Sequence, residues 1–122
     1  MIVGYFTDKP AEPQTKADTT ETVMRVLIGP DEGAKTFSMR LITIDPAGQI
    51  GLHKHPWEHE IFIVRGRGNA LVADEKRDLE PGSYVWIPPD EEHGFENIGN
   101  EPLEFVCCIP LKDEGRGRRE IE

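Results

Sequence analysis

Three of the four histidines in this chain of 122 residues lie in one short stretch, and the fourth lies in a second stretch. The first three are His53, His55 and His59 in GLHKHPWEHEIFIVRGRG (51–68), and the fourth is His93 in GSYVWIPPDEEHGF (82–95). Neutral imidazole is a good ligand for Mn, Fe, Co, Ni, Cu and Zn. Four histidines gathered in two stretches therefore predict a metal site.

The spacing of these histidines suits a curved strand. Side chains alternate along a strand, so His53, His55 and His59 have the same parity and can share one face. Pro56 interrupts the ladder between them, and we expect a bulge or bend there. His93 can then close the site from a neighbouring strand.

Short strands separated by turns must position these residues. The predicted strands are Ile2–Phe6, Val23–Ile28, Phe37–Ile44, Glu60–Val64, Asn69–Ala73, Arg77–Leu79, Ser83–Ile87, Gly94–Asn97 and Leu103–Ile109, with a turn at 45–48 and others at Gly and Pro clusters. Within 37–44, we expect Arg40, Ile42 and Ile44 to share one face. No segment keeps a helical period over three turns. The pattern predicts an all-β sandwich or barrel.

The length fits one domain with one core. We expect an N-terminal arm at 1–22 that includes the edge strand, a β-barrel at 23–110, and a charged, mobile tail at 111–122.

The composition excludes several classes of partner. A net charge of −9 and a pI near 4.9 argue against binding to nucleic acid. No apolar run approaches the roughly 20 residues that would cross a membrane, and the N-terminus lacks the pattern of a signal peptide. Cys107 and Cys108 are adjacent and point to opposite faces of a strand, so we expect two reduced thiols. A cytoplasmic location follows as the expectation.

Both histidine stretches resemble the motifs of the cupin family, G(x)5HxH(x)3–4E(x)6G and G(x)5PxG(x)2H(x)3N. In the first, His53-Lys54-His55 supplies HxH, and His59 stands where the family has a glutamate, with six residues between it and Gly66. In the second, the matching residues are Gly82, Pro88, His93 and Asn97. The chain departs from the motifs in two places: four residues rather than five separate Gly48 from His53, and Asp90 replaces a glycine.

The resemblance covers about residues 23–110 and implies a single-domain antiparallel cupin barrel, also called a double-stranded β-helix or jelly roll. The chain is most similar to small cupins that bind manganese through four histidines and are described as oxalate-decarboxylase-like. The predicted ligands are His53, His55, His59 and His93. An alternative register would use Glu60 in place of His59, although strand parity directs Glu60 to the other face.

Four neutral ligands leave the full double charge on a divalent metal, which is manganese by this resemblance, with Fe, Ni, Co or Zn as alternatives. Such a site favours a small anionic carboxylate at any open position. Small cupins commonly pair through their sheets, so a homodimer is predicted.

The reaction is less constrained than the site. We see no evident general acid, because Glu58 and Glu60 have the wrong parity. Arg40 is a candidate carboxylate-binding group. The aromatic and aliphatic candidates for the wall of the site or the barrel core are Trp57, Ile61, Phe62, Tyr84, Trp86 and Phe95. Three functions stay open: a metal-dependent decarboxylase or oxygenase, a non-catalytic anion-binding or sensing module, and a purely structural metal site.

Overall fold

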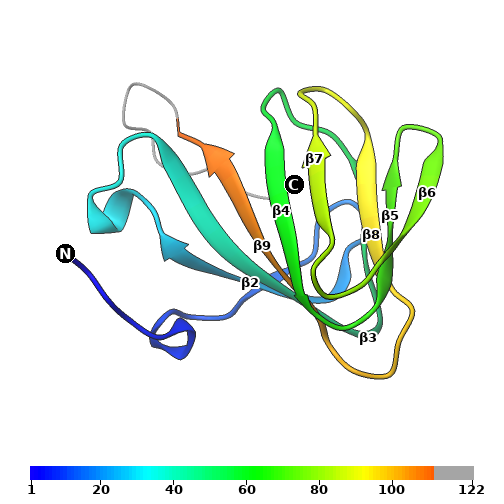
Figure 1. Ribbon diagram of the computed structural model, residues 1–122, viewed down its shortest axis with the longest axis horizontal. Coiled ribbons are helices and arrows are strands. Elements are labelled where there is room, and N and C mark those ends of the chain that lie inside the picture. The colour runs from blue at the N-terminus through cyan, green and yellow to red at the C-terminus, as the bar shows by residue number, and fades with distance from the viewer. Residues whose placement is uncertain (112–122) are drawn as a thin grey trace.

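The computed structural model describes residues 1–111, which form strands and two short 3-10 helices and contain no α-helix (Figure 1). The elements are η1 (Phe6–Asp8), β1 (Glu12–Gln14), β2 (Thr20–Ile28), η2 (Pro30–Glu32), β3 (Phe37–His53), β4 (His59–Arg65), β5 (Gly68–Val72), β6 (Glu75–Leu79), β7 (Tyr84–Ile87), β8 (His93–Asn97) and β9 (Leu103–Pro110). Within the described part of the chain, no helix is long and apolar enough to span a membrane.

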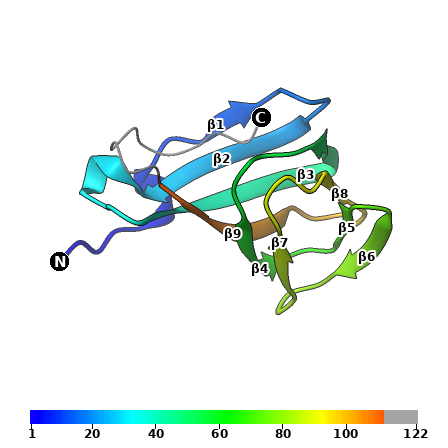
Figure 2. The same ribbon diagram turned by 90° about the horizontal axis from the view of Figure 1, so that it is seen from above.

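All strand pairs are antiparallel and belong to one curled sheet. The order is β6-β5-β8-β3-β9-β4-β7, and β2 and then β1 add beside β3. The sheet curls so that its two end strands, β6 and β7, come round towards each other (Figure 2). A cleft of about 560 Å³ lies between these two strands. The predicted all-β fold is confirmed. The curled sheet forms a half-barrel that is open between β6 and β7.

The strand β3 is 17 residues long and runs through the turn that we predicted at 45–48. The turn residues form a bulge instead: Thr22 pairs with Ile44, while Thr20 pairs with Gln49. Ala47 takes a positive φ of 70° within it. The turn prediction was wrong because this irregularity bends the strand without ending it.

The bulge is also where β3 changes one of its neighbours. Residues 37–44 pair with β9, and residues 49–53 pair with β8. One continuous strand therefore belongs to both halves of the curled sheet.

Alternation along the strands separates a buried inner face from an outer face. Arg40, Ile42 and Ile44 are all buried, which confirms the face predicted for them. On β9, Cys107 is buried and Cys108 is half-buried, and both thiols are free, as expected for neighbours on a strand.

The N-terminal segment differs from the prediction. Ile2–Phe6 is not a strand, because the Asp8 side chain accepts a hydrogen bond from the Tyr5 amide (2.8 Å) and a 3-10 turn forms at Phe6–Asp8. The edge strand of the arm is β1 instead, which pairs with β2. The predicted tail lies almost entirely outside the described residues.

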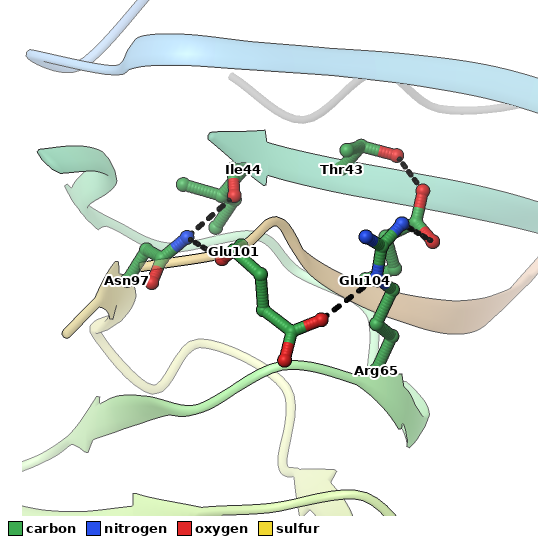
Figure 3. Close-up of polar contacts among 6 residues, drawn as sticks. All are labelled: Thr43, Ile44, Arg65, Asn97, Glu101 and Glu104. Carbon is green, nitrogen blue, oxygen red and sulfur yellow. Dashed lines mark hydrogen bonds and ion pairs between the residues drawn. The ribbon is translucent and has the colours of Figure 1, made fainter. Parts of the chain in front are cut away.

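Asn97, the last residue of the second cupin-like motif, connects three parts of the sheet (Figure 3). Its Nδ2 donates to the carbonyl oxygens of Ile44 on β3 (2.8 Å) and Glu101 in the following turn (2.9 Å). Its Oδ1 accepts from the amide of Gly99 (2.8 Å). The Glu101 side chain in turn pairs with Arg65 of β4 at 3.1 Å. The motif asparagine therefore has a structural role.

We expect Asn97→Ala to lower the free energy of unfolding by about 1–3 kcal/mol, because two carbonyl groups and one amide lose a buried partner. Urea unfolding followed by circular dichroism measures this loss. The control is Asn100→Ala, an exposed asparagine in the same turn, which should change stability by less than about 0.5 kcal/mol. Equal effects of the two variants would contradict the role given to Asn97.

Candidate metal centre

The four histidines come from three strands and one loop at the same end of the sheet. His53 ends β3, His59 begins β4 and His93 begins β8, while His55 lies in the loop between β3 and β4. His53 and His93 are direct partners across the β3–β8 ladder. All four side chains are buried, with exposures between 2% and 8%.

Their imidazole rings form a compact cluster. The ring of His93 lies 4.4 Å from that of His53 and 5.0 Å from that of His59, measured between centroids. The ring of His55 lies 4.8 Å from that of His53 and 5.2 Å from that of His59. The ligand atoms of His53, His55 and His93 all lie within 4.8 Å of one another, as one metal ion requires. His59 lies beside this group of three and is not part of it.

Backbone carbonyl groups orient two of the rings. Nδ1 of His53 is 2.7 Å from the carbonyl oxygen of Gly51, and Nδ1 of His93 is 2.9 Å from that of Glu91. A carbonyl can only accept, so each Nδ1 carries the proton and each Nε2 keeps its lone pair. This arrangement is typical of metal-binding histidines.

Burial keeps the rings of His59 and His93 neutral, which a metal ligand must be. Desolvation, reinforced by the neighbouring His93 and Arg40, lowers the pKa of His59 to about 2. Desolvation also lowers the pKa of His93 to about 4, against a hydrogen bond to Glu91 that raises it. Neither ring needs to lose a proton at neutral pH to bind a cation.

Nε2 of His59 also fits the role of a metal ligand. This atom is buried and has no hydrogen-bond partner among residues 1–111. A buried polar atom left in this way costs about 1–3 kcal/mol, and a metal ion would satisfy it. The neighbouring Glu60 is exposed on the opposite face of β4. The geometry therefore disfavours the register that uses Glu60.

The Pro-Pro-Asp turn of the second motif holds the loop that carries His55. The amide of Asp90 donates to the carbonyl oxygen of His55 (2.6 Å). Asp90 has a φ of +64°, which lies in the left-handed region. Glycine, the residue of the cupin motif at this position, adopts this conformation without strain, and aspartate tolerates it. The departure from the motif at this position thus keeps the backbone that the motif needs.

The N-terminal arm forms part of the wall behind His53, which sequence reasoning missed. A Cβ atom on Gly51 would lie only 1.7 Å from the carbonyl oxygen of Ala17. The Gly51 amide donates to Thr19 Oγ1 at 3.3 Å. The glycine at 51 is required because the arm packs directly against the residue whose carbonyl orients His53.

Several predicted wall residues lie elsewhere. Ile61 and Phe95 are in the core, and Trp57 is half-buried and stacks on His55 at 4.4 Å. In contrast, Phe62 is 50% exposed, Tyr84 is 85% exposed and Trp86 is 56% exposed, all on the outer face. The core role was wrong for these three, because the parity of β4 and β7 turns them outwards. Tyr84 and Trp86 do border the cleft between β6 and β7, whereas Phe62 does not.

Arg40 is completely buried and interacts with Cys107 rather than with an open site. Its Nε donates to the Cys107 carbonyl oxygen (3.3 Å) and its Nη2 lies 3.5 Å from Cys107 Sγ. Cys107 Sγ also lies 3.2 Å from Nδ1 of His59. Sequence reasoning missed these contacts, although the even spacing of Cys107 from Leu103 and Phe105 on β9 places it on the inner face.

Two known proteins are similar to a large part of this chain. The chain is 36% identical over 90 residues to an uncharacterised protein of Methanocaldococcus jannaschii, and the match covers 71% of each protein. It is 34% identical over 70 residues to an oxalate-binding protein of Thermotoga maritima, covering 56% of this chain and 57% of that protein. The chain thus spans less than two thirds of the second relative.

A solved structure shares almost the whole fold. The polyketide cyclase RemF of Streptomyces resistomycificus superposes with a TM-score of 0.85 at 30% identity, over 92% of this chain and 80% of that one. Residues 40–109, from the buried arginine of β3 almost to the end of β9, match the cupin domain. These residues include all four histidines, and the chain therefore belongs to the cupin family.

Proposed function

We propose that the four histidines hold one divalent transition metal, with manganese as the first candidate and Fe, Ni, Co or Zn as alternatives. The observation that carries this proposal is the convergence of four buried imidazoles, three of which offer ligand atoms within 4.8 Å of one another. His59 is proposed as the fourth ligand. Its buried Nε2 and its place between His55 and His93 support that role.

The charge of the site supports a small carboxylate as the ligand of the metal. Glu58 and Glu60, which flank His59, are both exposed on the outer face. Among the described residues, no aspartate or glutamate is buried. With neutral protein ligands, a bound dication keeps its full charge and attracts an anion with oxygen donors. A dicarboxylate or 2-oxo acid would fit if two adjacent positions on the metal are open.

The cleft between β6 and β7 is a suitable approach to this site. It is bordered by Val72, the strand partner of His93, and by Glu91, whose carbonyl group orients His93. Its walls also carry Glu75, Arg77 and Asp78, and Arg77 pairs with Glu75 at 3.0 Å. Since acidic side chains outnumber basic ones among these wall residues, the walls of the cleft add no net attraction for an anion.

The names of the relatives support different ligands. One is called an oxalate-binding protein, which fits a small dicarboxylate, and another a polyketide cyclase. We infer binding of a small carboxylate as the primary function, with decarboxylation or oxygenation as candidate reactions. The exposed positions of Glu58 and Glu60 favour the second candidate, an anion-binding or sensing module without turnover, because neither side chain can transfer a proton inside the site.

We also propose that the protein is a homodimer that uses the outer face of β4, β7 and β9. Phe62 lies directly opposite Tyr84 on one side and Val106 on the other, which gives a continuous apolar row. The N-terminal residues Met1, Ile2 and Val3 are also exposed and project from the sheet (Figure 1). An apolar arm and an apolar face on the same chain support pairing with a second copy.

The first prediction concerns the fourth ligand. We expect His59→Ala to weaken manganese affinity at least about tenfold, because one of four imidazole ligands is lost. Competition with a chelator measures the affinity, and a metal-dependent rise in Tm checks it. Glu60→Ala, the adjacent exposed carboxylate, is the matched control and should bind as the wild type does. If only Glu60→Ala loses manganese affinity, the fourth ligand is Glu60 and not His59.

The second prediction concerns the anion. We expect oxalate to change the electron paramagnetic resonance spectrum of the manganese-loaded protein, and acetate to do so only at higher concentration because it chelates poorly. The metal-free protein should bind neither. Turnover of oxalate or a 2-oxo acid would establish that the protein is an enzyme. A spectral change without turnover would establish that it is a non-catalytic binding module. If no small carboxylate changes the spectrum, the proposed anion binding is wrong and the metal site is structural.

The third prediction concerns assembly. Light scattering should give the mass of a dimer for the wild type, and Phe62→Glu should give a monomer because it places charges in the apolar row. Ile98→Glu changes an equally exposed apolar residue, 56% exposed, in the turn after β8 and should stay dimeric. A monomeric wild type at micromolar concentration would contradict the proposal.

A further inference from the structure

Cys107 occupies an unusual place beside the histidine cluster. It lies on the inner face of β9, directly opposite Arg40 on β3 and Ile61 on β4. His59 is two residues before Ile61 on β4, so Cys107 and His59 are diagonal neighbours on the same face. The strand register itself therefore brings the thiol to the imidazole.

The contacts of Cys107 join His59 to the buried cation. Sγ lies 3.2 Å from Nδ1 of His59 and 3.5 Å from Nη2 of Arg40. The guanidinium can only donate, and a thiol sulfur has lone pairs that accept hydrogen bonds. If the imidazole also donates from Nδ1, both contacts are satisfied and Nε2 of His59 keeps its lone pair.

The opposite arrangement would remove His59 from the site. A thiol proton donated to Nδ1 would leave the proton of the neutral ring on Nε2, which could then not bind a cation. His53 and His93 avoid this choice because backbone carbonyl groups accept from their Nδ1 atoms. For His59, the partner of Nδ1 is the side chain of Cys107, so the tautomer of the ring depends on whether this thiol accepts or donates.

We propose that Cys107 is a positioning residue for the metal centre: its sulfur accepts from Nδ1 of His59, fixes the ring and its tautomer, and keeps Nε2 directed to the metal. The proposal rests on the proposed role of His59 as a ligand. Arg40 holds the sulfur through one donor and the Cys107 carbonyl through another, so the cysteine is fixed from the other side. Arg40 also places a positive charge near the metal, which favours anionic ligands.

The variants Cys107→Ala, Cys107→Ser and Cys108→Ala test the proposal. We expect Cys107→Ala to weaken manganese affinity by about 10–100-fold, the usual effect of losing the partner of a ligating histidine. Cys107→Ser should restore most of the affinity because a hydroxyl oxygen also accepts from Nδ1. Cys108→Ala changes the adjacent thiol on the other face and should bind as the wild type does.

Two spectroscopic measurements separate positioning from packing. At saturating cobalt, the visible spectrum of Cys107→Ala should differ from the wild type, and that of Cys107→Ser should resemble it. In the metal-free protein, long-range ¹H–¹⁵N NMR should show His59 protonated at Nδ1, with the other tautomer appearing in Cys107→Ala. Circular dichroism confirms that each variant is folded.

The outcomes distinguish this inference from the proposed function. Wild-type affinity and spectrum in a folded Cys107→Ala, together with weak binding by His59→Ala, would overturn the role of Cys107 alone. An equal loss in the alanine and serine variants with an unchanged cobalt spectrum would also overturn it, because that pattern reports packing. If His59→Ala binds as the wild type does, the failure belongs to the assignment of His59 as a ligand.

Discussion

The bulge in β3 is the constraint on which the rest of the structure depends. β3 is 17 residues long, and β9, with 8 residues, pairs with only its first part. The extra residues at 45–48 bend the strand so that its second half pairs with β8. This bend curls the sheet, and it also carries His53 to the partner position of His93. The architecture and the metal centre thus have a common origin in one local irregularity.

The register of β4 then connects the two sides of the sheet. His59, Ile61 and Ile63 are buried, while the three residues between and after them, Glu60, Phe62 and Val64, are exposed. A shift by one residue would exchange the two sets and move both the histidine and the apolar row. The pairing of β4 with β7 and β9 therefore specifies the proposed metal ligand and the proposed dimer face together.

Strand parity made much of this predictable. It grouped Arg40, Ile42 and Ile44 on one face, directed Glu60 away from His59, and separated Cys107 from Cys108. The motif spacing was sufficient to group the histidines without knowledge of the strand order. These are local rules, and they hold wherever a strand has one buried face.

The failures were of another kind. Asp45-Pro46-Ala47-Gly48 has the composition of a turn, and only the pairing of β2 with β3 on both sides of this segment makes it a bulge. Tyr84 and Trp86 are aromatic residues in a short strand, and their apolar character suggested burial where parity did not. The contact between Cys107 and His59 depends on the order of strands in the sheet, which no local pattern contains.

The packing of Ala17 against Gly51 also bears on what constitutes the smallest working unit of this protein. The residues that match the cupin domain begin at Arg40, yet the carbonyl group of Ala17 occupies the space where a side chain at position 51 would lie. Thr19 accepts from the amide of the same glycine. A fragment of residues 40–109 alone would lack Ala17 and Thr19. Water would then reach Gly51, the residue whose carbonyl group orients His53. In this cupin, the boundary of the homologous domain and the boundary of the candidate metal centre do not coincide.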